Sequence, residues 1–232
     1  MKSTFTKIAL STALLMSSSL FASEIKVKIT NLTKGIYFTP LLVSAHKQSA
    51  KLFTAGQASS SALQKMAEGG DVSELLTNLN TAGANSSENP AGGLLAGGAS
   101  TTVSLSTTTG NDYLSIVAMM LPTNDGFVAL NSLKIPTAAG TYKYELNAHD
   151  AGTEANDEII NGGGAPNTPG IPGAPDGTSG TGATGLTSTA EGFVHIHRGN
   201  IGDFDATGGK SDINAQTERF LNPVASVIIT VK

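Results

Sequence analysis

Alternation of apolar and polar residues marks most of this chain as β-strand. Residues 24–29 (Glu-Ile-Lys-Val-Lys-Ile) alternate with a period of two, which is the pattern of a strand buried on one face. Residues 113–121 form an almost unbroken apolar run, which predicts a central strand buried on both faces. The turn sequence Pro-Thr-Asn-Asp-Gly at 122–126 then predicts a hairpin. Further strands are expected at 38–43, 101–107, 127–133, 141–146, 193–197 and 224–231.

A single stretch of the chain changes to a helical period. Leu63, Met66 and Ala67 recur at helical spacing and predict one short helix. Asp71 and Glu74 have the spacing of a capping box, which predicts that a second short helix begins beside them. We expect these two helices to form a short insertion that closes one end of a sheet core.

The strand pattern favours an all-β fold. About eight strands with one helical interruption predict an antiparallel β-sandwich. Residues 81–100 consist largely of Gly, Ala, Ser and Asn, which is typical of a loop. Residues 162–185 are rich in Gly and Pro without the strict triplet of collagen, so they predict a long loop or linker. We expect one domain over residues 23–232.

The first 22 residues have the organisation of a signal peptide. Lys2 and Lys7 supply a positive start, residues 8–15 are apolar, and Ala22 is a small residue suited to cleavage. The apolar run is too short to span a bilayer, and no second run of spanning length follows. The sequence therefore predicts a secreted or periplasmic protein, with residues 1–22 removed, and the style of the leader is bacterial.

Composition narrows the function classes. The 232 residues carry a formal net charge of −4 and no Lys/Arg cluster, which argues against nucleic acid as a partner. The chain has no cysteine, which excludes thiol catalysis, thiolate zinc sites and disulfides. Motifs of serine hydrolases, zinc peptidases, P-loop proteins and Rossmann enzymes are absent from the sequence, so we do not expect an enzyme. The sequence does not indicate an oligomeric state.

Chain reversals predict where two carboxylates meet. If strand 113–121 runs towards one end of the sheet, the chain turns at Asp125, and a second reversal returns Asp150 to that same end. Two strands across a sheet span about 10 Å, so both side chains can approach one cation. Calcium takes six to eight oxygen ligands and tolerates irregular loops, and a cation relieves the repulsion of clustered acids. The alternative is that both residues simply form turns, since Asp is a good turn residue.

Three blocks of sequence resemble the spondin N-terminal domain family, and its bacterial exported members most of all. They are PTNDGFVALNSL at 122–133, HDAGTEANDE at 149–158 and NPVA at 222–225. The likeness extends from about Val27 to the C-terminus. It implies a C2-like β-sandwich and an extracellular module for adhesion or matrix binding, with an extracellular protein or glycan as partner.

The same resemblance implies a calcium site. Its ligands would be Asp125, Asp150 and, as a third, Glu154. Animal members supply a further acid from the strand before the central one, but residues 104–107 here (Ser-Leu-Ser-Thr) contain no carboxylate, so that ligand is missing or replaced. The cysteines and thrombospondin repeats of animal members are also absent, so their receptor roles do not transfer. Asp157 and Glu158 are interpreted as a solvated loop face.

Two weaker candidates stand apart from this site. Asp203 and Asp205 imitate the first half of an EF-hand loop, but Asn214 replaces the bidentate glutamate, so a turn is the alternative. His195 and His197 lie two apart on a predicted strand and therefore share a face, a spacing that suits zinc or copper.

The histidine pair defines the second functional hypothesis. A third ligand could come from His149 or Asp203, and the alternative is a histidine pair that hydrogen-bonds at a strand end. The sequence thus predicts a secreted calcium-binding interaction module first. The second hypothesis is a periplasmic protein that binds a transition metal or a carbohydrate through His195 and His197.

Overall fold

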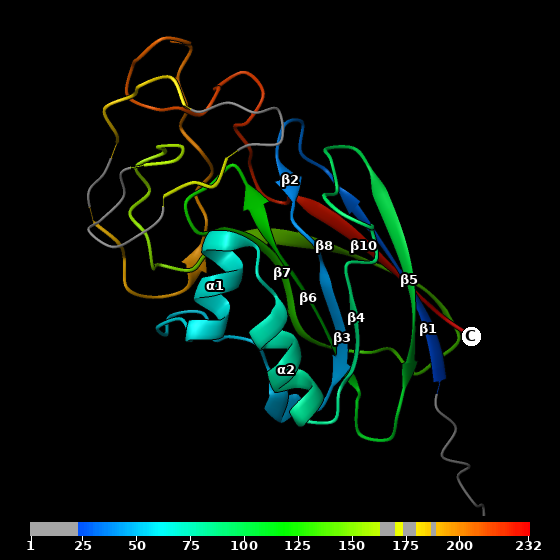
Figure 1. Cartoon of the computed structure of the whole chain (residues 1–232). Coiled ribbons are helices and arrows are strands. Elements are labelled where there is room, and N and C mark those ends of the chain that lie inside the picture. Colours follow the sequence, from blue (N-terminus) through cyan, green and yellow to red (C-terminus); the bar gives the residue numbers. More distant parts are fainter. Residues whose placement is uncertain (1–22, 163–169, 174–179, 187–188) are drawn as a thin grey trace, which may run out of the picture.

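A computed structural model describes residues 23–162, 170–173, 180–186 and 189–232 of the chain (Figure 1). The predicted signal peptide, residues 1–22, and most of the Gly/Pro-rich segment 162–185 lie outside the described residues. Strands dominate the described part, and two short α-helices lie between them. The all-β prediction is therefore confirmed at this level.

The strands form one antiparallel sheet. Its order is β4-β3-β6-β7-β8-β10-β1-β5, with β2 added to β6 and β9 added to β8. The ten strands of the described residues outnumber the eight that were predicted. Their bounds are β1 Ser23–Asn31, β2 Tyr37–Phe38, β3 Leu42–His46, β4 Asn85–Glu88, β5 Ser100–Thr107, β6 Tyr113–Leu121, β7 Gly126–Lys134, β8 Gly140–Asp150, β9 His195–Ile196 and β10 Ala225–Val231.

Strand β6 is buried on both faces, as its apolar run predicted. Ile116, Ala118 and Met120 point into the main core, where they meet the apolar face of β1 and β10. Val117, on the opposite face of β6, packs in a second core beneath the helices. Because successive side chains of a strand point to opposite faces, a strand between two cores must be apolar at nearly every position.

Helix α1 lies against β6 and β7, and helix α2 lies against β3 and β4 (Figure 1). Helix α1 spans Ser61–Gly69, and the hydroxyl of Ser60 accepts a hydrogen bond from the Leu63 amide at its start. Helix α2 spans Ser73–Thr81. Their apolar residues pack on the sheet face that carries Phe127. A short 3-10 helix, η1, spans Gln48–Ala50.

Four local predictions were wrong in detail. The expected strand 38–43 is interrupted at residues 39–41, which separate β2 from β3. The capping box does not form: the N-cap of α2 is Val72, and Asp71 instead accepts a hydrogen bond from the Ser73 amide, two residues on. The predicted loop 81–100 contains β4, a wholly polar edge strand paired with β3. The predicted strand 193–197 is regular only at β9.

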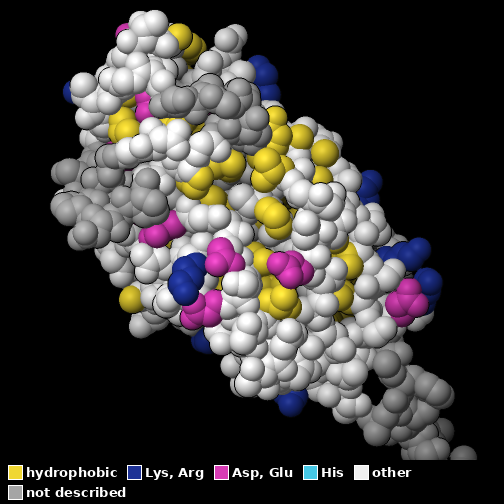
Figure 2. All heavy atoms as spheres, viewed as in Figure 1, with side chains coloured by type: hydrophobic (Ala, Val, Ile, Leu, Met, Phe, Trp, Pro, Cys, Tyr) yellow, Lys and Arg dark blue, Asp and Glu magenta, His cyan; other side chains and the backbone are white. Residues whose placement is uncertain are grey.

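The loops that leave β6, β8 and β9 gather at one end of the sheet (Figure 1). We call this end the rim, comprising residues 122–126, 150–162 and 191–222. Within the described residues, the helices are too short and too polar to cross a bilayer. On the face seen in Figure 2, acidic and basic side chains are dispersed and mixed in sign.

Candidate metal centre

The register of β7 and β8 places Asp125 and Asp150 side by side at the rim. Gly126 pairs with Asp150 across the two strands, and the Ala151 amide donates to the Asp125 carbonyl at 3.1 Å. The prediction that two chain reversals bring these acids together is confirmed. They lie on directly paired strands and not two strands apart, because Asp125 immediately precedes β7.

Asp125 is fully buried, and only one of its two carboxylate oxygens is hydrogen-bonded. Its Oδ2 accepts hydrogen bonds from the amides of Thr153 (2.6 Å) and Glu154 (3.1 Å) and from the Thr153 hydroxyl (3.2 Å). Its Oδ1 has no hydrogen-bond partner among the described residues. Burial and the charge of Asp150 raise the pKa of Asp125 to about 7, although the three donors oppose this shift.

Asp150 is also buried, and its carboxylate is oriented by close neighbours. The Gly152 amide donates to Oδ1 at 2.8 Å, and the Asn156 side-chain amide donates to Oδ2 at 2.9 Å. His195 Nε2 lies 3.4 Å from Oδ1, and His197 Nε2 lies 4.0 Å from Oδ2. Burial raises the pKa of Asp150 above its ordinary value.

Glu154 completes a set of three buried acids. Its Oε2 lies 3.5 Å from the side-chain nitrogen of Asn124, which is a weak hydrogen bond. Its Oε1 is buried and, in the part of the chain that the structure describes, unpartnered. Burial, followed by the charges of Glu68 on α1 and Asp125, raises the pKa of Glu154 to about 8.

Among the described residues, no Lys or Arg forms an ion pair with the three carboxylates. The nitrogens nearest to the Asp150 carboxylate belong to His195 and His197. Burying like charges is costly unless a counter-charge joins them. The two unpartnered oxygens, on Asp125 and Glu154, are acceptors that a cation could satisfy. The ligand atoms that lie within 4.8 Å of one another among the described residues belong to a different group, Asp150, Glu191 and His195.

The two aspartates of the 203–208 segment have a different role. Asp203 accepts hydrogen bonds from the amides of Asp205 (2.9 Å), Lys210 (2.8 Å) and Ser211 (3.0 Å), and these donors lower its pKa. Asp205 accepts from the Thr207 amide at 2.9 Å. Their oxygens bind the backbone of their own loop, which favours the turn interpretation over the EF-hand-like one.

His195 and His197 flank Asp150 from β9 and the residues after it. The prediction that they share a side is consistent with this placement. Neither proposed third ligand joins them: His149 packs against Phe53 and Phe127 in the core, where burial lowers its pKa, and Asp203 binds its own loop. Burial likewise lowers the pKa of His197 to about 3.

Several site residues were missed at the level of sequence. Glu191 lies near His195 and Asp150, and Glu68 on α1 acts on Glu154. Asn156 binds the carboxylates of both Asp150 and Glu191. For these missed residues, the sequence offered a single indication, the spacing of four residues between Glu191 and His195. Asp157 and Glu158, interpreted as a solvated face, are in fact buried.

Comparison with known families assigns the chain to one of them. The Spondin_N family model matches residues 28–162, more than half of the chain, so the chain belongs to the Spondin_N family. The matched region contains Asp125, Asp150 and Glu154. A search of curated proteins gives no match.

Proposed function

We propose that this chain is an exported, calcium-binding interaction module of the spondin type. The observation that carries the proposal is that two buried oxygens, Asp125 Oδ1 and Glu154 Oε1, have no hydrogen-bond partner among the described residues. The charge of Asp150 acts on Asp125, and the charge of Asp125 acts on Glu154. A calcium ion would offset the repulsion among these charges, and backbone carbonyls and water would complete its six to eight ligands. Asp125, Asp150 and Glu154 are the proposed protein ligands.

Calcium would order the surface that meets a partner. The loops 122–126 and 150–158 carry the three ligands, so one ion would link them and make the rim rigid. Phe193 and Ile196, on the segment that packs beside Asp150, are 43% and 51% exposed. Exposed apolar side chains can take part in a binding surface where they form a contiguous patch. We infer an extracellular protein or glycan as the partner.

The proposal includes a C2-like sandwich and export from the cell. The contact between β4 and β5, the two ends of the sheet order, supports a sheet folded over on itself. The leader-like residues 1–22 support a secreted or periplasmic protein. Because the chain contains no cysteine, its fold needs no oxidising machinery. No catalytic role is part of the proposal.

Calcium titration by isothermal calorimetry tests the proposed function. We expect one calcium ion to bind more tightly than about 1 mM, the weak end of the range for extracellular calcium modules. The melting temperature should rise in parallel, because the ion binds only the folded state. Absence of both heat and stabilisation at about ten times that concentration would contradict the proposal.

Metal-free protein is expected to lose stability as the pH rises from about 6.5 to about 8.5. In this range the folded chain holds protons on Asp125 (pKa about 7) and Glu154 (pKa about 8), whereas the unfolded chain does not. Since the folded state binds more protons, its free energy of unfolding should fall by about 2 kcal/mol. Burial lowers the pKa values of His46, His149 and His197, so near pH 6.5 the unfolded chain binds protons on them that the folded chain does not, and they offset part of this loss.

Urea denaturation in chelator and in saturating calcium measures this pH dependence. Calcium displaces the protons, so its affinity should grow with pH and the loss of stability should disappear. A free energy of unfolding that stays level or rises with pH in chelator would contradict the assigned carboxylates.

A further inference from the structure

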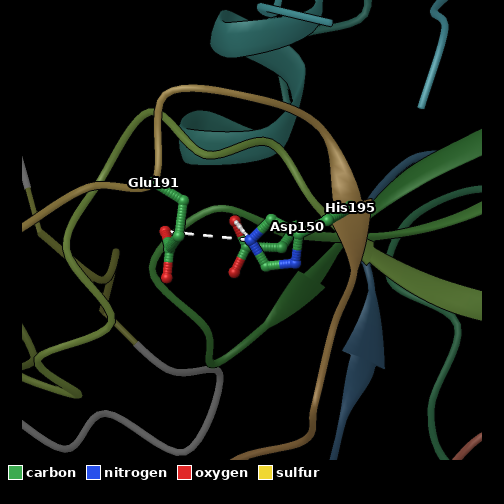
Figure 3. Close-up of side chains that lie close together, drawn as sticks. All are labelled: Asp150, Glu191 and His195. Carbon is green, nitrogen blue, oxygen red and sulfur yellow. Dashed lines mark ion pairs between the residues drawn. The ribbon is translucent and has the colours of Figure 1, made fainter. Parts of the chain in front are cut away.

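Three side chains that offer oxygen and nitrogen ligand atoms converge at the rim, and one of them, Asp150, is also a proposed calcium ligand (Figure 3). Asp150, Glu191 and His195 each offer one ligand atom, and these atoms lie within 4.8 Å of one another. His195 Nε2 is 3.4 Å from Asp150 Oδ1 and 3.9 Å from Glu191 Oε2. Two ligands of a tetrahedral zinc ion are about 3.3 Å apart, since zinc bonds to nitrogen and oxygen are about 2.0–2.1 Å long.

We propose that Asp150, Glu191 and His195 form a second cation site, which binds a divalent first-row transition ion of the zinc class. This site shares Asp150 with the calcium site but has its own ligands in Glu191 and His195. The inference goes beyond the proposed function, because it would stand even if Asp125 and Glu154 bound no calcium.

The hydrogen bonding of His195 prepares its Nε2 atom as a ligand. His195 Nδ1 lies 3.0 Å from the Ile196 carbonyl, which can only accept, so Nδ1 carries the hydrogen. Nε2 of the neutral ring therefore presents a lone pair towards two carboxylates. It is buried and has no hydrogen-bond partner among the described residues. A lone pair that faces two carboxylates is unfavourable, and a cation bound between the three groups would remove this repulsion. A histidine that binds a metal through Nε2 carries its hydrogen on Nδ1, as His195 does here.

His197 faces Asp150 and is not itself a ligand. Its side chain is 3% exposed, and its Nδ1 accepts a hydrogen bond from the Gly199 amide at 2.9 Å. Nε2 therefore carries the hydrogen and points towards Asp150 Oδ2 at 4.0 Å, without a partner in the described chain. At 4.0 Å this buried donor is too far away to hydrogen-bond Oδ2, and it faces the oxygen opposite the one nearest to His195.

Asn156 orients both carboxylates at once. Its side-chain nitrogen donates to Asp150 Oδ2 at 2.9 Å and to Glu191 Oε1 at 3.1 Å. The other oxygens, Asp150 Oδ1 and Glu191 Oε2, are left on the side of His195. Three ligands from this chain leave a fourth position for water.

The backbone fixes the segment that carries Glu191 and His195. The Gly192 amide donates to the Gly152 carbonyl at 2.8 Å, and the Val194 amide donates to the Gln57 carbonyl at 2.8 Å. The side chains of Glu191 and His195 are 24% and 26% exposed, so an ion can enter from solvent. An imidazole nitrogen among the ligands favours zinc-class ions over calcium, which prefers oxygen.

Zinc titration by calorimetry at neutral pH tests this site with the full chain. We expect one zinc ion to bind, and we expect His195→Ala and Glu191→Gln each to weaken zinc binding at least tenfold more than calcium binding. Glu145→Gln, an exposed glutamate on β8, is the matched control and should leave the zinc affinity within about twofold. Circular dichroism confirms that each variant is folded.

The outcomes separate this inference from the calcium proposal. Zinc binding that depends on His195 supports the second site even if calcium produces no heat. No zinc binding by the wild-type chain, or zinc affinities in both folded variants within twofold of wild type, would overturn it. Anomalous diffraction at the zinc edge then places the ion: beside His195 Nε2 it supports the site, and elsewhere it overturns it.

Discussion

Replacing Gly152 with alanine is expected to lower the free energy of unfolding by about 3 kcal/mol or more. Gly152 has a φ of +70°, and a Cβ atom there would overlap the backbone oxygen and nitrogen of Phe193. Backbone atoms cannot rotate away as a flexible side chain can, so the 191–197 segment would have to leave β8. Because that segment carries Glu191 and His195, zinc binding should be lost together with stability.

Urea denaturation of Gly152→Ala beside Gly83→Ala measures this effect. Gly83 has a similar φ of +78°, but nothing lies within 4 Å of its Cβ position. The control variant therefore reports backbone strain alone, and we expect it to cost about 1 kcal/mol. Equal losses in the two variants would show that the close approach of Phe193 to Gly152 does not determine how the rim packs.

Replacing Asp125 with asparagine is expected to weaken calcium binding at least a hundredfold, about 2.7 kcal/mol. The asparagine oxygen can still accept the Thr153 and Glu154 amides, so the loop keeps its main hydrogen bonds. The variant has lost a buried charge that repels Asp150, and its metal-free form should be at least as stable as wild type at about pH 8. If Asp125 instead had a structural role, the metal-free Asp125→Asn variant would be less stable than wild type.

Calorimetry with calcium and urea denaturation in chelator together check this prediction. Asp205→Asn is the matched control, because Asp205 caps its own loop from an exposed position. It should leave calcium affinity within about twofold of wild type. If Asp125→Asn and Asp205→Asn changed calcium affinity equally, Asp125 would not be a ligand.

Much of the sheet could be predicted because burial on one face imposes a period of two on the sequence. Strand β1 alternates and is buried at Ile25, Val27 and Ile29, whereas β6 lies between two cores and is apolar at nearly every position. Strand β4 was not predicted, because its residues Asn-Ser-Ser-Glu contain no apolar side chain to bury. It is held by backbone pairing with β3, and backbone pairing leaves no pattern in the side chains.

The site residues also fall into those that could be predicted from the sequence and those that could not. Asp125 and Asp150 could be predicted to meet because short connections between consecutive strands fix the end of the sheet at which each turn lies. Glu154 came from the family resemblance. Glu68 and Glu191 could not be predicted, because α1 and the 191–197 segment reach the rim through contacts between residues far apart in the sequence. The close approach of Gly152 to Phe193 is one such contact.

A crystal structure grown with calcium tests the central claim most directly. We predict one ion bound at about 2.3–2.6 Å by Asp125 Oδ1, by Glu154 Oε1 and by the carboxylate of Asp150. An ion bound elsewhere, with the oxygens of Asp125 and Glu154 still unpartnered in calcium-saturated crystals, would contradict the claim.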